Sequence, residues 1–318
     1  MQADARSPFL VKTNLSHTWG LVLLFAAGAL WSLNGALIKL VAADGQGPHG
    51  VTIACYRSMV AGLFLLPFGI RRFRTLKRGT GLRWLGGLRP AAVSCVVFFT
   101  LMTACFVMAN TMTEAANAII LQYTSTFWIF GLSPLVLGEK PNARDVWIVA
   151  VAMLGIGVIF AGNATTSAAG LLIALLAGLF YALLTLMIRQ MRDSDSAAIT
   201  VLNNLGSAFL LFPIVWWLGE IWVSPRAALL LVFMGVVQFG LPYYLYTLGL
   251  ARVPAYQAAL VTMIEPVLVP IWAYLAVGEQ VPVMTAVGGG VILAALLWFV
   301  QNARVRARGT RPPATESD

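Results

Sequence analysis

Ten apolar segments divide this chain, and their length constrains its fold more than any other feature of the sequence. An α-helix needs about 20 apolar residues to cross the hydrocarbon core of a bilayer, and each segment is close to that length. Hydrophobic residues make up 59% of the chain and charged residues only 10%, whereas soluble domains carry about 25% charged residues. The sequence therefore predicts an all-α integral membrane protein with ten transmembrane helices in a lipid bilayer. The segments are residues 19–43, 50–70, 89–109, 113–137, 145–162, 168–190, 197–218, 226–250, 254–275 and 282–302.

Lysine and arginine are concentrated in alternate loops, which indicates how the segments are oriented. The loops on one side of the predicted membrane hold 18 of the 21 Lys and Arg residues, whereas the loops on the other side hold only Arg226. Cytoplasmic loops carry an excess of these residues. We therefore expect both termini and the basic 71–89 loop to lie in the cytoplasm, with the chain in the inner membrane. The net charge of +9 then reflects membrane orientation, and nucleic acid is not an expected partner.

The chain also contains an internal repeat. A shift of 140 residues places Gly138-Glu139-Lys140 on Gly278-Glu279-Gln280, and each of these triplets follows an apolar segment. Two halves, residues 19–164 and 165–302, hold five segments each and are flanked by polar tails at 1–18 and 303–318. An odd number of segments forces the second half to enter the membrane from the opposite side. Inverted repeats with a site between them near the midplane are a common architecture of transporters.

Three stretches resemble a known family. GALWSLNGALIKLV (28–41) and EAANAIILQYTSTFWIFGLSPLVLGEK (114–140) in the first half, and YTLGLARVPAYQAALVTMIEPVLVPIWAYLAVGEQ (246–280) in the second, resemble the EamA-type domain of the drug/metabolite transporter superfamily. The resemblance covers nearly all of residues 19–302. It implies a transporter of small organic metabolites, such as amino acids or related, partly apolar solutes, and favours export by alternating access. An uptake carrier or an exchanger of the same fold is the alternative.

An enzyme or a sensor is less well supported by the sequence. The chain shows no cluster of catalytic residues, and its two histidines, His17 and His49, flank the first segment on opposite sides of the predicted membrane. Such a placement cannot form a common metal site, so neither a metal nor another cofactor is expected. The predicted partners are a small-molecule substrate and the lipid bilayer.

Glu265 in the ninth segment is the strongest candidate for a functional residue. A carboxylate near the bilayer midplane costs several kcal/mol unless it is compensated, so it marks a functional site by default. Glu265 either couples transport to protons or binds a substrate amine, or else it is a structural carboxylate paired with a cation. Pro266 has no N–H for the carbonyl of Thr262, and that carbonyl is expected to help hold a proton. Arg57 lies at a similar predicted depth, so it is the first expected partner of Glu265, and binding of a substrate carboxylate is the alternative role.

Aromatic and polar side chains that share helical faces are predicted to line a substrate path, because polar groups avoid lipid. Three prolines are candidate hinges: Pro242, Pro266 and Pro270. The candidate lining residues are Trp31, Asn34, Arg57, Asn117, Gln122, Trp128, Tyr181, Gln257, Glu265 and Trp272.

The segment ends and the tenth segment carry further expectations. Lys39 is expected to extend toward the nearer membrane surface. The glutamates of the two Gly-Glu pairs are interpreted as hydrated anions at helix ends, or as half of a salt bridge that holds one side of the protein shut. Ala286, Gly290 and Ala294, with Gly288 and Gly289 between them, form a small-residue stripe that favours close helix packing within the protomer, with a homodimer interface as the alternative.

Overall fold

The computed structural model describes residues 17–43, 47–75, 90–137, 143–162, 167–190, 196–250, 261–262 and 264–309. Within these ranges the chain is almost entirely helical and contains no strand. The helices are α1 (His17–Ser32), α2 (Asn34–Ala42), α3 (Gly50–Thr75), α5 (Pro90–Met112), α6 (Ala115–Tyr123), α7 (Ser125–Leu137), α8 (Ala143–Gly162), α9 (Ala168–Gln190), α10 (Ser196–Trp217), α11 (Pro225–Phe233), η1 (Met234–Gly240), α12 (Leu241–Leu250), α14 (Ile264–Val277) and α15 (Val283–Gly309).

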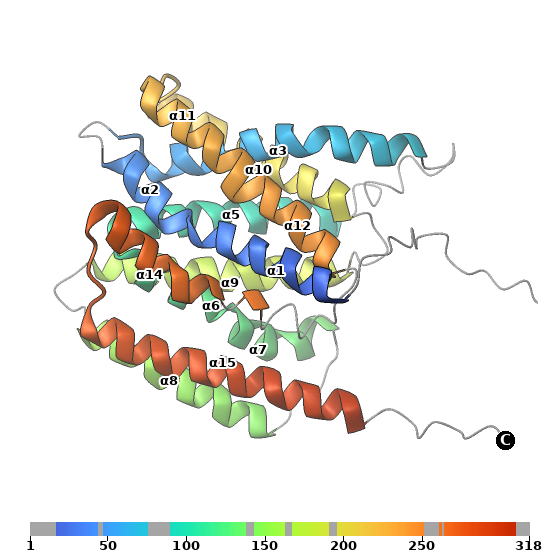
Figure 1. Cartoon of the computed structure of the whole chain (residues 1–318), viewed down its shortest axis with the longest axis vertical. Coiled ribbons are helices and arrows are strands. Elements are labelled where there is room, and N and C mark those ends of the chain that lie inside the picture. The colour runs from blue at the N-terminus through green and yellow to red at the C-terminus, as the bar shows by residue number, and fades with distance from the viewer. Residues whose placement is uncertain are drawn as a thin grey trace, which may run out of the picture.

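The predicted fold class, an all-α membrane protein of ten helices in two five-helix repeats, is confirmed. Within the described ranges, six helical stretches are long and apolar enough to cross a membrane, and three shorter apolar helices accompany them. The α8 and α15 helices lie side by side along one edge of the bundle (Figure 1). Figure 1 also shows that α1 begins and α15 ends at the same end of the bundle, as an even number of spans requires.

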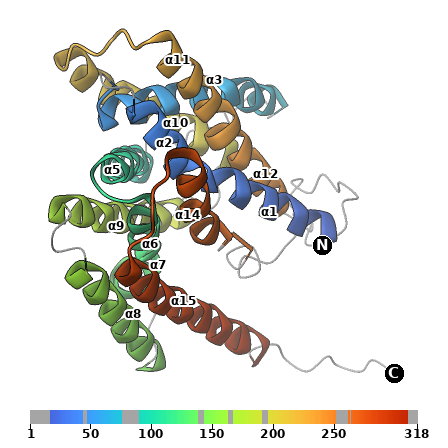
Figure 2. The ribbon, with the colours of Figure 1, turned by 60° about the vertical axis from the view of Figure 1, so that its left-hand side comes forward.

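Helix packing relates the two halves by an approximate two-fold symmetry. The most extensive contacts pair α1 with α12, α3 with α10, α5 with α9, and α8 with α15. In terms of the ten spans, these pairs are first with eighth, second with seventh, third with sixth, and fifth with tenth. Exchange of the two repeats converts the pair of spans one and eight into the pair of spans six and three. It leaves the pair of spans two and seven and the pair of spans five and ten unchanged. Each of these four pairs therefore joins one half to the other, as Figure 2 shows from a second direction.

Two spans that the sequence predicts as continuous are broken near their middle. The first span divides into α1 and α2 at Leu33, and the fourth divides into α6 and α7 at Thr124. At the second break the Thr124 hydroxyl donates to the Leu121 carbonyl at 2.5 Å, and the Thr124 N–H donates to the same carbonyl at 3.2 Å. A threonine side chain that bonds back to the preceding turn offers the backbone an alternative to the regular helical ladder, and such a bond accompanies the break at this position.

The eighth span contains a stretch of π-helix, η1, between α11 and α12. Pro242 follows η1 by two residues and has no N–H to donate to the carbonyl of Gln238. The N–H of Leu241 bonds instead to Val236, five residues back. Such π-turns are frequent at functional sites, and this one directs Phe239 and Gln238 into the interior, where both are buried. The candidate hinge at Pro242 thus lies beside an irregular helix.

The small residues of α15 make the expected packing contact within the protomer, but only some of them take part in it. Ala286, Gly290 and Ala294 are exposed, and a Cβ placed on Gly290 would meet nothing within 4 Å. The contact with α8 is made by Gly288 instead, where a Cβ would lie 2.5 Å from the carbonyl oxygen of Gly155. Spacing alone identified the helix surface that contains small residues, but the rotation of α15 about its axis is decided by its contact with α8.

Candidate functional site

Glu265 lies in the first turn of α14, and its carboxylate is bound by a tyrosine from the other half of the chain. The hydroxyl of Tyr123, the last residue of α6, is 3.0 Å from Glu265 Oε2. The same hydroxyl is 3.2 Å from the carbonyl oxygen of Thr262, which is the carbonyl that Pro266 cannot serve. The sequence therefore correctly identified an unusual acceptor at Thr262 but did not identify the group that approaches it.

Arg57 is 2% exposed and does not form the predicted ion pair with Glu265. Its guanidinium donates to Asn34 Oδ1 at 2.7 Å and to Thr103 Oγ1 at 2.5 Å. The guanidinium carbon lies 4.3 Å from the centre of the Phe239 ring, a cation–π geometry. The ion pair was predicted because the two residues have a similar predicted depth in the membrane. In the structure, however, Arg57 points from α3 toward α2 and α5, whereas Glu265 points from α14 toward α6.

A series of aromatic rings connects the surroundings of these two charged groups. The Trp31 ring is 5.2 Å from that of Tyr243 and 5.3 Å from that of Tyr246, and Tyr243 is 5.3 Å from Phe239. Tyr243 lies within electrostatic range of both Arg57 and Glu265. Tyr181 lies within electrostatic range of Tyr243, Tyr246 and Glu265. We call the following residues the central cluster: Trp31, Arg57, Tyr123, Tyr181, Phe239, Tyr243, Tyr246 and Glu265.

The break between α1 and α2 is tied to two other spans beside the central cluster. The indole N–H of Trp272 on α14 donates to Ser32 Oγ at 2.9 Å. The amide of Gln238 in η1 donates to the carbonyl of Trp31 at 3.4 Å. Both candidates, Trp31 and Trp272, therefore lie at this break, where side chains from other spans bind the Ser32 hydroxyl and the Trp31 carbonyl.

Among the described residues, no side-chain hydrogen bond or ring contact joins the remaining sequence candidates to the central cluster, and one candidate lies outside that part of the chain. The amide of Gln122 points toward α5, with its nitrogen 3.5 Å from Met102 Sδ. Trp128 lies on α7 and is 39% exposed. Gln257 lies outside the described residues. Pro266 and Pro270 lie within α14, and Pro266 immediately follows the central carboxylate.

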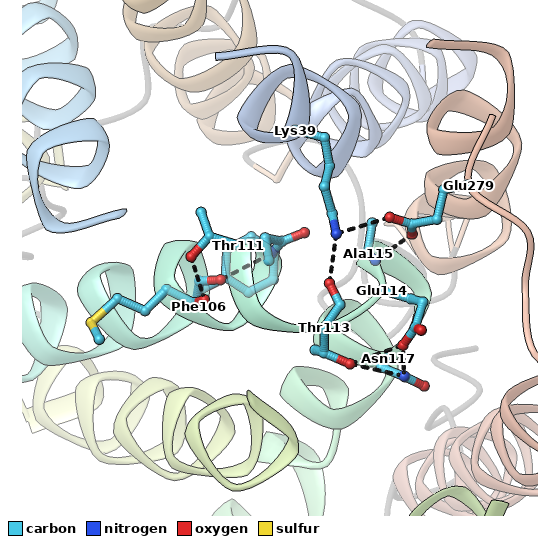
Figure 3. Close-up of polar contacts among 10 residues, drawn as sticks. Lys39, Phe106, Thr111, Thr113, Glu114, Ala115, Asn117 and Glu279 are labelled. Atoms are coloured by element: carbon cyan, nitrogen blue, oxygen red, sulfur yellow. Dashed lines mark hydrogen bonds and ion pairs between the residues drawn. The ribbon is translucent and has the colours of Figure 1, made fainter. Parts of the chain in front are cut away.

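Lys39, which is expected to extend toward the nearer membrane surface, takes part in an ion pair between the two halves. Its Nζ is 2.9 Å from Glu279 Oε2 and donates to the carbonyl of Thr113 at 2.7 Å. The other oxygen of Glu279, Oε1, accepts from the N–H of Ala115 at 2.6 Å, at the first residue of α6 (Figure 3). Of the two interpretations of the Gly-Glu pairs, a salt bridge therefore describes Glu279.

The positive φ of Gly278 explains how Glu279 reaches these partners. Gly278 has φ of 71°, a left-handed conformation that glycine adopts without steric cost at the end of a helix. The N–H of Gly278 donates to the carbonyl of Tyr274 at 2.9 Å, and α14 ends at the preceding residue, Val277. The next residue is consequently turned toward α2 and α6, where its carboxylate meets a lysine and a helix N-terminus that both favour negative charge.

Asn117 belongs to the same end of the molecule and not to the central cluster. Its Nδ2 donates to Glu114 Oε2 at 2.5 Å and to Thr113 Oγ1 at 3.1 Å (Figure 3). Its Oδ1 accepts from the Thr285 hydroxyl of α15 at 2.7 Å. We call the following residues the Lys39 network: Lys39, Thr113, Glu114, Ala115, Asn117, Glu279 and Thr285.

A second glutamate makes a similar contact between the two halves. Gly219 has φ of 73° and follows α10, and Glu220 comes next. Glu220 Oε2 accepts from the N–H of His49 at 2.9 Å, immediately before α3, and from the Thr52 hydroxyl. Glu220 is not among the residues predicted from the sequence, although the Gly-Glu pattern at the end of an apolar segment was a signal that could have found it. Tyr123 was also missed, and only its position opposite Glu265 reveals its role.

A metal site is not supported within the described ranges, because no group of three or more His, Cys, Asp or Glu side chains there could hold an ion.

Two long stretches, residues 18–161 and 168–301, match the family described as the EamA-like transporter family. An uncharacterized transporter from Archaeoglobus fulgidus is 28% identical over 218 residues, which cover 68% of this chain and 78% of the relative. The uncharacterized transporter YwfM of Bacillus subtilis is 26% identical over 293 residues, or 88% of this chain and 93% of the relative. One solved crystal structure is 19% identical, with a TM-score of 0.61 over 88% of this chain and 96% of that chain. This last likeness concerns the fold alone.

Proposed function

The chain belongs to the EamA-like transporter family, and from this premise we propose that it exports small zwitterionic metabolites, amino acids or related solutes, by alternating access. The observation that carries the proposal is a pair of opposite charges in the interior, Arg57 and Glu265, each held by neutral partners. Uptake or exchange by the same fold is the alternative. The direction of export rests on family resemblance and is therefore tested directly below.

The two charges suit a substrate that carries both a carboxylate and an amine. A buried charge is costly unless an opposite charge compensates it. Within the described residues, Arg57 has no acidic partner, and its Nε has no hydrogen-bond acceptor. A substrate carboxylate would compensate Arg57, since a guanidinium binds carboxylates through two N–H groups, and a substrate amine would compensate Glu265.

The aromatic members of the central cluster favour a substrate with an apolar portion. Binding sites for small molecules are lined mainly by apolar and aromatic groups, with few polar groups that fix orientation. Trp31, Tyr243 and Tyr246 form a continuous group of rings. Tyr181 approaches the same region from α9 in the second half. This composition suits an amino acid with an apolar or aromatic side chain better than a highly polar metabolite.

The contacts at the Lys39 end support alternating access between the halves. Glu279 and Glu220 come from the second half, and each binds the start of a first-half helix. A carboxylate at a helix N-terminus contributes about 0.3–1 kcal/mol, and a partly exposed ion pair contributes a similar amount. Contacts of this strength hold one end closed and yet break readily during a cycle. By the distribution of Lys and Arg, this end faces away from the cytoplasm.

The substrate and the direction are tested by the solutes that cells release. We expect cells that overproduce the protein to accumulate zwitterionic amines in the medium, relative to cells that lack it, in untargeted metabolite analysis. Cells that produce Glu265→Gln at an equal membrane level serve as the control and should resemble the cells that lack the protein.

The solute identified in this way is then tested in liposomes that hold the purified protein, by counterflow and in both membrane orientations. Release only of solutes that lack an amine would overturn the substrate class. Inward accumulation of the solute in intact cells would establish uptake in place of export.

A further inference from the structure

The hydroxyl of Tyr123 faces two acceptors but has a single hydrogen to donate. Glu265 Oε2 is 3.0 Å away and the carbonyl oxygen of Thr262 is 3.2 Å away. Both acceptors belong to the ninth span, whereas Tyr123 ends α6 in the fourth. The choice between the two acceptors is therefore a choice between two hydrogen-bond arrangements at the interface of the halves.

We infer that Tyr123 is a positioning residue that keeps Glu265 hydrogen-bonded in both of its protonation states and so enables it to exchange protons during transport. This inference rests on the proposed transport function. When Glu265 is ionised, Tyr123 donates to the carboxylate. When Glu265 has taken up a proton, its O–H donates to the Tyr123 oxygen, and the Tyr123 hydrogen turns to the carbonyl of Thr262.

The second arrangement depends on a proline. In a regular helix the N–H of residue 266 would donate to the carbonyl of Thr262, but Pro266 has none. That carbonyl therefore keeps acceptor capacity for Tyr123. An unpaired buried polar group costs about 1–3 kcal/mol, so a site that pairs its groups in both charge states lowers the barrier to changing charge. Glu265, Tyr123 and the backbone at Thr262 together meet that requirement.

The surroundings of Glu265 leave Tyr123 as the group that responds to its charge. The elements packed against α14 are α1, α2 and α6. From Trp19 to Ser32, α1 has no titratable side chain, and Lys39 on α2 is paired with Glu279. The other tyrosines in electrostatic range are Tyr181 on α9 and Tyr243 on α12. Among these groups, Tyr123 is the one whose contact with Glu265 has hydrogen-bond geometry.

The position of Tyr123 links this exchange to helix movement. The adjacent break at Thr124 separates α6 from α7, and α9 approaches it closely at Gly178, where a Cβ would lie 2.9 Å from both the Leu121 carbonyl and the Thr124 hydroxyl. A change at Tyr123 therefore acts on a helix end that is already irregular. The other end of α6 is Ala115, which is bound by Glu279 in the Lys39 network. The α6 helix thus connects the central carboxylate to the closed end.

The contact is tested by infrared difference spectroscopy of the purified protein in lipid nanodiscs, with a change of pH as the probe. Glu265→Gln identifies the carboxyl band of Glu265 by its loss. We expect Tyr123→Phe to move this band to higher frequency, because a carboxyl group that loses a hydrogen bond absorbs at higher frequency. Tyr274→Phe is the matched control: Tyr274 lies on the same helix as Glu265 and is 59% exposed, so the band should stay in place.

A second variant acts on the alternative acceptor. Pro266→Ala supplies an N–H to the carbonyl of Thr262, which then competes with Tyr123 for that carbonyl. We expect this change to alter the band of the protonated carboxyl and to leave the ionised form as in the parent protein. This variant keeps the proposal testable if Tyr123→Phe is produced poorly.

The effect on conformation can be measured without knowledge of the transported solute. Spin labels are attached to cysteines that replace Met112 and Trp222, in a protein from which Cys55, Cys95 and Cys105 have been removed, and the distance between the labels is measured. We expect this distance distribution to change with pH in the parent and in Tyr274→Phe, and to lose its pH dependence in Glu265→Gln and in Tyr123→Phe. A Glu265 band unmoved by Tyr123→Phe, or a distance that ignores pH in the parent, would overturn the proposal. A failure to find any exported solute would instead contradict the proposed function, since the infrared measurement requires none.

Discussion

Arg57 and Glu265 carry opposite charges in the interior of the bundle, yet each has its own set of partners. Asn34 and Thr103 accept from Arg57, and Tyr123 donates to Glu265. An ion pair would have compensated both charges within the protein and left neither for a substrate. Whether these charges remain available to a substrate therefore depends on which side chains they contact.

Substitutions at these two residues should have additive effects on stability. Residues that share no contact usually give additive changes within about 0.5 kcal/mol, whereas the loss of one partner from a buried ion pair costs about 3–5 kcal/mol and is relieved by removing the other. We expect the loss in melting temperature of Arg57→Gln plus Glu265→Gln to equal the sum of the two single losses. Thermal unfolding of the three purified variants measures this. Recovery of stability in the double variant would show that the two residues are paired.

The broken spans show how single elements prepare the site. Tyr123 comes directly before the break at Thr124, and Trp31 comes close before the break at Leu33. In lipid, irregular backbone is tolerated where protein or water supplies its hydrogen bonds. Side chains from other spans do so here, as with Gln238 and the carbonyl of Trp31. The breaks in these helices therefore lie next to the candidate site residues Trp31 and Tyr123.

The close approach of α9 to one of these breaks makes a testable contribution to stability. At Gly178 a Cβ would lie 2.9 Å from the carbonyl oxygen of Leu121, and backbone of this kind does not move away cheaply. We expect Gly178→Ala to destabilise the protein by about 1–3 kcal/mol. Gly131→Ala is the control, because a Cβ there meets nothing within 4 Å and alanine favours a helix by about 0.5–1 kcal/mol. Equal melting temperatures for the two variants in detergent would contradict the packing at Gly178.

Over the whole molecule, contacts between the halves differ between the centre and the Lys39 end. In the centre, Tyr123 meets Glu265 across the interface. At the Lys39 end, Glu279 and Glu220 each bind a helix start of the other half. A transporter that alternates access must break one set of end contacts while it keeps its central site assembled. The Lys39 network is the set that this conformation keeps closed.

A charge change at Lys39 should open the end of the molecule that the Lys39 network closes, and a compensating change at Glu279 should oppose that opening. A cysteine placed at Ala118, which is buried one turn beyond Ala115, reports access. In a background without native cysteines, we expect Lys39→Glu to increase the rate at which a membrane-impermeant external maleimide labels it, since like charges then face each other. The exchanged pair, Lys39→Glu with Glu279→Lys, should lower the rate part of the way, because it restores the ion pair but not the bonds to the N–H of Ala115 and the carbonyl of Thr113. Rapid labelling of the parent protein would show that this end is open.

Orientation in the membrane follows from the distribution of charge and has a direct test. We expect a cysteine at Lys77, in the basic loop predicted to be cytoplasmic, to resist an impermeant reagent in intact cells and to react in everted vesicles. Trp222→Cys is the control from the opposite end, since Trp222 is 92% exposed; it should react in intact cells. The reverse pattern would invert the topology.

The membrane class and the two five-span repeats follow from the amino-acid sequence alone, and the sequence also predicts Glu265 as a functional residue. These follow from rules that act within one segment: the length of an apolar run, the cost of a charge in lipid, and the hydrogen bond that a proline removes. The similar depth expected of Arg57 and Glu265 is a prediction of the same kind, because a helix rises about 1.5 Å per residue. Rules of this kind are enough for properties that depend on one segment at a time, such as its length, its orientation in the membrane and the predicted depth of its residues.

Only the tertiary structure decided which residues meet. Depth does not specify direction, so Arg57 met Asn34 and Thr103 while Glu265 met Tyr123. Lys39 met Glu279 because the left-handed Gly278 turned the chain and because α2 and α14 pack together. The rotation of each helix about its axis is set by contacts with helices distant in sequence, such as Gly288 on Gly155. Partners therefore depend on the packing of the whole bundle, and no pattern within one segment contains that information.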